Sequence, residues 1–134
     1  MQIRAYRNSD EEGVVALWHT CGLTRPWNDP HKDIARKLTV QRDLFLVGEL
    51  ESRLMATVMA GFEGHRGWVN YLAVSPDFRG CGFGARLMKV VEEMFVERGC
   101  PKVNLVVRST NKAVLDFYCR LDTRSMMWSL WARG

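Results

Sequence analysis

The stretch that decides the fold is Arg79-Gly80-Cys81-Gly82-Phe83-Gly84. It follows residues 68–74, whose aromatic and branched side chains are typical of a strand, and it precedes residues 85–98, where apolar residues recur at helical spacing. Three glycines between a strand and a helix let backbone N–H groups turn toward one point with no Cβ in the way. That point lies at a helix N-terminus, where free N–H groups and the helix dipole favour an anion. The sequence therefore predicts a phosphate or pyrophosphate site at this loop.

Two other kinds of phosphate-binding loop do not match this stretch. A P-loop requires Lys followed by Ser or Thr at the helix start, whereas Gly84 is followed by Ala85-Arg86. A dinucleotide-binding loop spaces its glycines as G-x-G-x-x-G and needs an acidic residue after a second strand, about 20 residues on. Neither feature is present, so both loop types are excluded.

The composition is that of one globular domain. Of the 134 residues, 47% are hydrophobic and 25% are charged, which is enough to bury a core without disulfides or metals. The net charge of +4 suits an anionic ligand, and ordinary variation explains it equally well. Because Lys and Arg form no long block, we expect no nucleic acid partner.

The cysteines and the N-terminus indicate a cytoplasmic protein. The cysteines, at positions 21, 81, 100 and 119, show no CxxC pair and no zinc spacing, so we expect reduced thiols and no metal site. The first residues are too polar for a signal peptide, and no apolar run reaches membrane-spanning length. We therefore expect a cytoplasmic location and no membrane contact.

Periodicity and turn signals predict an α/β domain over residues 1–134 with the order β-α-α-β-β-β-α-β-α-(β). Antiparallel hairpins come first and a βαβ unit follows. We expect Ser9 to cap the first helix in a capping box with Glu12, and Asp29 to cap the second. Strands are expected at 2–6, 44–50, 54–62, 68–74 and 102–107, and helices at 9–22, 30–38, 85–98 and from 110 or 111 to 121.

With these elements in place, the chain resembles the GCN5-related N-acetyltransferases (the GNAT family), which move an acetyl group from acetyl-CoA to an amine. The resemblance covers residues 2–121 and rests on residues 71–84 (YLAVSPDFRGCGFG) and 111–121 (NKAVLDFYCRL). Residues 26–30 and 64–67 further resemble a small bacterial subgroup whose acceptor substrate is unassigned. The resemblance implies a GNAT-like mixed sheet with an antiparallel first half. It also implies that the strand before the loop carries a bulge and splays from its parallel neighbour at the cofactor site.

The same resemblance implies that the cofactor is acetyl-CoA. Backbone amides of the glycine-rich loop would hold the pyrophosphate, and backbone groups of the preceding strand would meet the pantetheine and polarise the acetyl carbonyl. Asn111 would bind the cofactor, although capping of its helix explains this residue equally well. The implied cofactor-binding residues are Leu72, Ala73, Val74, Arg79, Gly80, Cys81, Gly82, Phe83, Gly84, Ala85, Asn111 and Tyr118.

Three titratable side chains are candidates for catalysis. Tyr118 matches the family tyrosine that protonates the departing CoA thiolate, and an interfacial phenol is the alternative interpretation. The attacking amine must lose a proton, and we predict Glu63 as the base, with His65 as the second choice. Both residues can equally be turn residues that face solvent.

The acceptor side is predicted at Trp27, Asn28 and Asp29, which would set substrate choice or pack two helices together. The expected function is N-acetylation of a primary amine of a small molecule or a protein, by direct attack in a ternary complex. The alternative function, from another class, is a non-catalytic module that binds CoA or acyl-CoA.

The last residues, 122–134, depart from the family pattern. After Phe-Tyr-x-x-Leu the family has Gly-Tyr or Gly-Phe and then a strand, whereas Leu121 is followed by DTRSMMWSLWARG. One extra G before the codon of Asp122 allows the rereading Gly-Tyr-Glu-Ile-Asp-Asp-Val-Val-Ser-Leu-Gly-Lys-Arg. We hypothesise a shifted reading frame, which sequencing of the source gene tests, and a restored frame without a family ending would refute it. The Met- and Trp-rich tail also allows self-association, which leaves a homodimer open.

Overall fold

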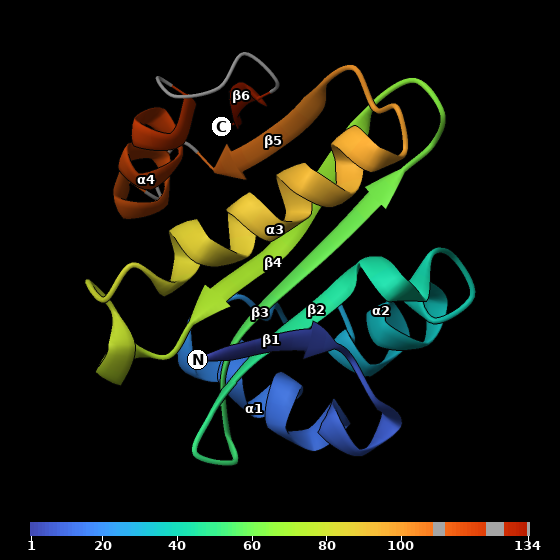
Figure 1. Cartoon of the computed structure of the whole chain (residues 1–134). Coiled ribbons are helices and arrows are strands. Elements are labelled where there is room, and N and C mark those ends of the chain that lie inside the picture. Colours follow the sequence, from blue (N-terminus) through green and yellow to red (C-terminus); the bar gives the residue numbers. More distant parts are fainter. Residues whose placement is uncertain (109–111, 123–127, 134) are drawn as a thin grey trace.

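The computed structural model describes residues 1–108, 112–122 and 128–133, and these residues form one six-stranded mixed sheet with helices (Figure 1). The strands lie in chain order across the sheet. The pairs β1–β2, β2–β3 and β3–β4 are antiparallel. The pairs β4–β5 and β5–β6 are parallel. This arrangement confirms the predicted element order and the antiparallel first half. The elements are β1 (Gln2–Ala5), α1 (Glu11–Thr20), α2 (Pro30–Lys37), β2 (Phe45–Leu50), β3 (Arg53–Phe62), β4 (Gly67–Val74), α3 (Phe83–Glu97), β5 (Val103–Arg108), α4 (Lys112–Asp122) and β6 (Trp128–Arg133).

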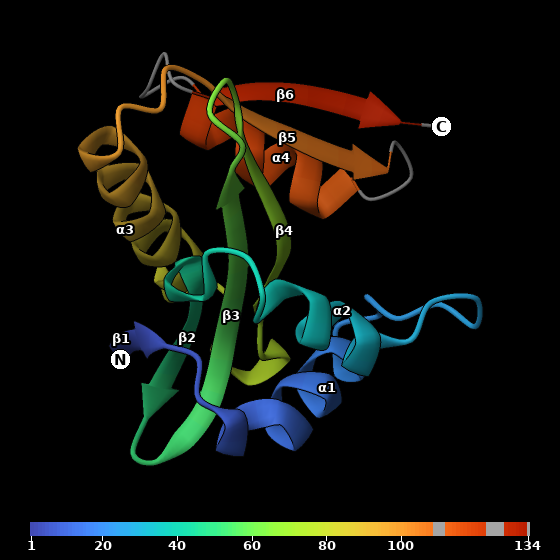
Figure 2. The same ribbon diagram turned by 90° about the vertical axis from the view of Figure 1, so that its right-hand side faces the viewer.

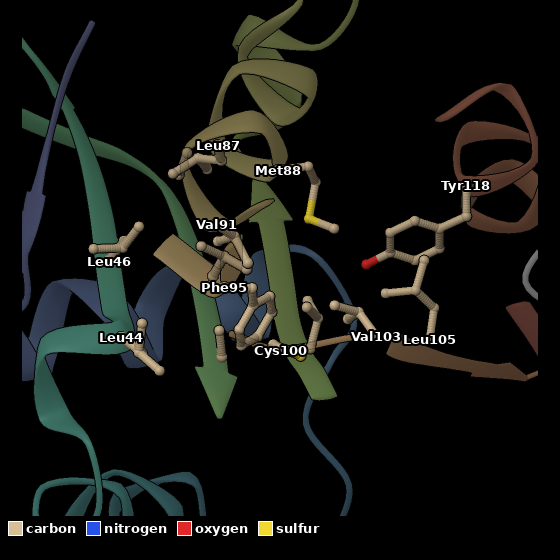
Figure 3. Packing of buried hydrophobic residues seen from close by; sticks show 14 of the residues in the cluster. Leu44, Leu46, Leu87, Met88, Val91, Phe95, Cys100, Val103, Leu105 and Tyr118 are labelled. Carbon is tan, nitrogen blue, oxygen red and sulfur yellow. The ribbon is translucent and has the colours of Figure 1, made fainter. Parts of the chain in front are cut away.

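Helices on both faces of the sheet produce two cores. Helices α1 and α2 lie on one face and α3 lies on the other (Figure 2). The α3-side core joins α3 and α4 to the sheet and contains Phe95 and Tyr118 (Figure 3). The α1-side core contains Trp18 and Ile34. Because β3 lies between the two cores, its residues 55–60 are all buried, and all of them except Thr57 are apolar.

Strand β4 contains a bulge. Its pairing with β3 shifts register between Thr57 and Met59, opposite Tyr71 and Leu72. Tyr71 has a φ of 51°, in the left-handed region that residues other than glycine seldom adopt. Val69 and Leu72 pack in the α3-side core, whereas Tyr71 packs in the α1-side core. The bulge therefore sends the Tyr71 side chain to the face opposite the one that strict alternation from Val69 predicts.

Strands β4 and β5 pair only near their beginnings. Residues 67–69 of β4 lie opposite residues 103–105 of β5, and the described residues contain no later pair between these strands. Strand β5 continues to pair with β6 as far as Arg108. The two parallel strands therefore diverge after Val69, which confirms the predicted splayed pair.

The start of α1 differs from the prediction. Ser9 lies in a 3-10 turn of residues 8–10 that precedes the helix, and it does not cap it. The carboxylate of Asp10 instead accepts a hydrogen bond from the backbone N–H of Arg7 (2.8 Å) and two from the guanidinium of Arg4 (2.8 and 2.9 Å). Because β1 brings Arg4 to this turn, the Asp10 carboxylate is held there and accepts the hydrogen bond from a backbone N–H of the turn, a role that was predicted for the Ser9 side chain.

The Arg4–Asp10 pair makes stability depend on pH. The hydrogen bonds from Arg4 lower the pKa of Asp10, against the effect of burial. A carboxyl group with a depressed folded-state pKa stabilises the fold above its unfolded pKa of about 3.9, and this stability is lost as the pH falls through the folded pKa. In urea unfolding, we expect Asp10→Asn to cost about 1–3 kcal/mol at pH 7 and less below pH 4. A difference between the two proteins that stays constant down to pH 2 would contradict this.

The final predicted strand is present as β6, which pairs with β5 from Trp128 opposite Val103 to Arg133 opposite Arg108. Residues 123–127 and 134 of the tail lie outside the described residues, and the shifted reading frame stays a hypothesis. In the described part of the chain, no helix combines the length and the apolar composition needed to cross a membrane.

Candidate active site

Two hollows meet at the bulge of β4. The first, of about 490 Å³, runs along the glycine-rich loop and is named the loop groove. The second, of about 390 Å³, is lined by β4, β5, α4 and the α1–α2 connection and is named the bulge hollow. Leu23, Leu72 and Val114 line both. A long ligand in the loop groove therefore ends beside the bulge hollow.

The glycine-rich loop has the backbone conformation of an anion site. Gly80 and Gly82 have φ values of 80° and 79°, and α3 begins at the next residue, Phe83. Nothing lies within 4 Å of a Cβ built on either glycine, so their backbone conformation, and not packing, requires glycine. The free N–H groups of the first turn of α3 and the positive end of its dipole lie at this open loop. These groups fit a pyrophosphate.

Contacts with neighbouring elements hold the loop in place. A Cβ on Gly84 would lie 3.2 Å from Cζ of Phe117, so glycine lets α3 approach α4 closely. Nε of Arg79 donates to the carbonyl oxygen of Val74 (3.3 Å), and Sγ of Cys21 donates to the same oxygen (3.4 Å). Arg79 thereby joins the loop to the end of β4, and Cys21 joins the end of α1 to the same residue of β4.

Most of the predicted cofactor-binding residues meet at the loop groove. Cys81 is exposed and is not among the lining residues, and Tyr118 lines the bulge hollow instead. Asn111 lies outside the described residues. The predicted residues that line the groove are Leu72, Ala73, Val74, Arg79, Gly80, Gly82, Phe83, Gly84 and Ala85.

Gly82→Ala should weaken binding of CoA. A side chain at a φ of 79° costs about 1–2 kcal/mol, so the loop will move away from its anion-binding conformation. We expect the Kd for CoA, measured by calorimetry, to rise about tenfold. Gly13→Ala is the matched control, because its Cβ enters open space in α1 at an ordinary φ. An unchanged Kd in folded Gly82→Ala would refute an anion site at this loop.

Tyr118 lines the bulge hollow with a phenol that stays protonated at neutral pH. Its side chain is 5% exposed and its ring lies edge-on to Phe117, with 5.4 Å between centroids. In Figure 3 the hydroxyl points away from α4, toward the centre of the cluster. Burial raises the pKa of Tyr118, and within the described residues its hydroxyl has no hydrogen-bond partner. A protonated phenol that lacks a hydrogen-bond partner among the described residues can donate a proton to a group that enters the hollow.

Tyr71, on the bulge, is part of a second polar group. Its hydroxyl donates to Oδ2 of Asp33 (2.5 Å), and Nδ2 of Asn28 donates to both Tyr71 Oη (3.1 Å) and Asp33 Oδ2 (2.6 Å). Nη2 of Arg36 donates to the other Asp33 oxygen (2.6 Å). Tyr71 and Asn28 line the bulge hollow.

The pKa values of this pair shift in opposite directions. Burial raises the pKa of Tyr71, and the hydrogen bond and negative charge of Asp33 raise it further. Burial would also raise the pKa of Asp33, but the hydrogen bonds from Tyr71, Asn28 and Arg36 outweigh it and the pKa is lowered. At neutral pH, Tyr71 is therefore protonated and Asp33 is ionised.

The residues predicted for the acceptor side lie on the α1–α2 connection. Trp27, which is 75% exposed, and Asn28 line the bulge hollow. Asp29 caps α2, as predicted, and its Oδ1 accepts from the backbone N–H of His31 (2.9 Å). Asp29 is not among the lining residues of the bulge hollow.

Glu63 and His65 lie in the turn between β3 and β4. Oε1 of Glu63 accepts from the backbone N–H groups of His65 (3.2 Å) and Arg66 (2.6 Å). Neither Glu63 nor His65 lines the loop groove or the bulge hollow. The structure therefore does not bring these two predicted residues together with Tyr118.

Sequence reasoning missed Tyr71 and Asp33, which it assigned only to a strand and a helix. One signal could have pointed to Tyr71: a tyrosine in a buried strand needs a polar partner for its hydroxyl. That partner lies 38 positions earlier in the chain, and no local pattern links the two.

Comparison with protein families gives a match to the acetyltransferase (GNAT) family over residues 10–122. An acetyltransferase of Yersinia enterocolitica is 49% identical over 122 residues, which are 91% of this chain and 86% of the relative. An acetyltransferase of Pectobacterium atrosepticum is 48% identical with the same coverage.

Solved structures share the fold at lower identity. Ard1 from Thermoplasma volcanium has a TM-score of 0.78 and 23% identity, over 90% of this chain and 80% of that one. The PaiA N-acetyltransferase from Thermoplasma acidophilum, solved in complex with coenzyme A, has a TM-score of 0.76 and 16% identity, over 90% and 87%.

Proposed function

This chain belongs to the acetyltransferase (GNAT) family, and we propose that it moves the acetyl group of acetyl-CoA to a primary amine of a small molecule or a protein by direct attack in a ternary complex. One observation carries the proposal: the loop groove and the bulge hollow meet at the point where β4 and β5 diverge. The donor and the acceptor can thus reach one point from two sides.

Acetyl-CoA supplies an acetyl group that is activated as a thioester. The backbone amides of residues 80–85 bind its pyrophosphate, and the β5-facing edge of β4, over residues 72–74, binds the pantetheine and polarises the acetyl carbonyl. Tyr118 donates a proton to the departing thiolate. Glu63 and His65, the predicted bases, line neither hollow, so either would have to reach the amine proton through water molecules. Trp27 and Asn28, which line the bulge hollow, border the acceptor, and Asp29 caps the helix that follows them.

The test is release of the CoA thiol from acetyl-CoA in the presence of an amine. We would use spermidine, tyramine, lysine, an aminoglycoside and a peptide with a free N-terminus. Amine-dependent thiol release, with a product heavier by one acetyl group, supports the proposal. Tight binding of acetyl-CoA with no turnover of any amine would favour the alternative, a module that only binds CoA.

We also propose a cytoplasmic location. The four cysteines are free, and Cys21 and Cys100 donate hydrogen bonds to backbone carbonyl oxygens as thiols. Such a chain suits a reducing compartment. Fractionation of cells that express a tagged copy checks this.

A further inference from the structure

The acceptor side of the bulge holds two polar side chains, Tyr71 and Asp33, that the roles above do not use. The Tyr71 hydroxyl donates to Asp33 and accepts from Asn28. Tyr71 and Asn28 line the same hollow as Tyr118. The Asp33 side chain is 19% exposed, so its carboxylate still reaches solvent. These groups form a continuous path from the bulge hollow to water.

Packing fixes the Tyr71 hydroxyl in position. The Tyr71 ring stacks on Trp18, with 3.7 Å between centroids. The indole N–H of Trp18 donates to Oγ1 of Thr57 (2.9 Å), and that hydroxyl donates to the Tyr71 carbonyl oxygen (2.9 Å). Both the ring and the backbone of Tyr71 are thus held, and rigid placement of this kind is what a catalytic group requires.

The hydrogen bonds of the Tyr71 hydroxyl leave one lone pair of its oxygen unused. A phenol oxygen carries one proton and two lone pairs. The proton is donated to Asp33, and one lone pair accepts from Asn28. In the described part of the chain no other donor reaches this oxygen, so its second lone pair is available to an N–H of an amine.

The surrounding charges keep the pair in the required protonation states. Arg36 donates a hydrogen bond to Oδ1 of Asp33. This hydrogen bond and the positive charge of Arg36 favour the ionised form of Asp33. The pair therefore starts as a neutral phenol that donates to a carboxylate.

We propose that Tyr71 and Asp33 form a proton relay that accepts the proton of the attacking amine; this rests on the proposed acetyl transfer. As the amine nitrogen forms its bond to the acetyl carbon and the carbon–sulfur bond breaks, the amine proton passes to Tyr71 Oη, and the proton of Tyr71 passes to Asp33 Oδ2. The departing thiolate takes the proton of Tyr118. Asp33 then gives its proton to water, Tyr118 regains one, and both residues return to their starting states.

Tyr71→Phe and Asp33→Asn test the relay, because each keeps the shape of its side chain. With the fastest acceptor of the amine panel, we expect either variant to lower kcat about 100-fold with a much smaller change in the KM for acetyl-CoA. Tyr6→Phe and Asp43→Asn are the matched controls. Tyr6 is a buried tyrosine of the same core, and Asp43 pairs with Arg98 at the surface, both outside the two hollows.

The pH profile separates a relay from a structural role. In the wild type, kcat should reach a plateau once the acceptor amine is neutral, because the relay takes the proton without help from solvent. In Tyr71→Phe and Asp33→Asn, hydroxide from the solvent must take the proton of the amine. Because the hydroxide concentration increases with pH, log kcat of these variants should keep rising with pH. A lost structural contact would instead lower kcat by the same factor at every pH, and that result would overturn the relay.

A titration without substrates gives a second readout. Phenolate absorbance reports the ionisation of the chain's three tyrosines. Asp33→Asn should lower the pKa of one tyrosine, and this change should vanish in the Tyr71→Phe, Asp33→Asn double variant. No change in Asp33→Asn would overturn the coupling of the two residues.

The remaining outcomes separate this proposal from the one on which it rests. If no amine supports turnover by the wild type, both proposals fail. If the wild type is active and Tyr71→Phe matches Tyr6→Phe in kcat, the relay alone fails. A 100-fold loss in Glu63→Gln with full activity in Tyr71→Phe would give the role of base to Glu63 and overturn the relay.

Discussion

Tyr118→Phe is expected to lower kcat about 100-fold while it leaves the Kd of acetyl-CoA within about twofold. The substitution removes only a hydroxyl, and the ring keeps its place among the buried residues around Phe117 and Met88. Without that proton donor, CoA must depart as a bare thiolate. Since the hydroxyl has no partner within the described residues, its loss leaves no polar group unpaired there.

Steady-state thiol release and calorimetric binding of acetyl-CoA measure these two quantities. The thermal midpoint of Tyr118→Phe should stay close to that of the wild type, which shows that the fold is intact. Equal losses in kcat and in acetyl-CoA affinity would count against the acid role, because they would indicate uniform binding. Acetyl thioesters of more acidic thiols should lose less rate in the variant, since their thiolates need the proton less.

Trp18→Ala is expected to cost about 3–5 kcal/mol of folding free energy, the largest stability effect among the substitutions considered. Trp18 is fully buried, and its ring stacks on Tyr71 and Phe45. Its indole N–H also holds Thr57, which in turn holds the backbone of the bulge. The alanine variant leaves a cavity and removes the donor to Thr57 at the same time.

Urea denaturation measures this loss, with Trp68→Ala as the matched control. Trp68 is 42% exposed on β4, so its truncation should cost about 1 kcal/mol or less. If Trp18→Ala does not fold, Trp18→Phe keeps an aromatic ring without the N–H and should cost about 1–2 kcal/mol. A cost for Trp18→Ala no greater than that for Trp68→Ala would refute a central role for Trp18.

The sequence predicted the features that depend on local patterns. The three glycines, the flanking apolar periodicity and the cap at Asp29 all act within a few residues, and the order and type of the main elements follow from them. The capping prediction at Ser9 was wrong because the partner of Asp10, the Arg4 guanidinium, comes from a neighbouring strand. Whether Ser9 or Asp10 binds the backbone at the start of α1 therefore depends on a tertiary contact, which the local sequence does not show.

The candidate site was only partly predictable for the same reason. The resemblance to a family pointed to Tyr118 and to the splayed strands. The place of Glu63 at a strand end favours it as a base, and nothing in the sequence indicates that its carboxylate accepts from two turn amides. The left-handed φ of Tyr71, which aims that side chain toward Asp33, has no counterpart in the residue pattern of β4.

The bulge in β4 has a consequence for how this enzyme can change its substrate. Leu72 packs in the α3-side core and its neighbour Tyr71 packs in the α1-side core, so adjacent residues of β4 face opposite sides of the sheet. Substitutions in residues 25–37, which include the Asn28 and Asp33 partners of Tyr71, would alter what is acetylated without touching the lining of the loop groove. Evolution, or an engineer, can therefore exchange the acceptor half of the enzyme while the donor half stays constant.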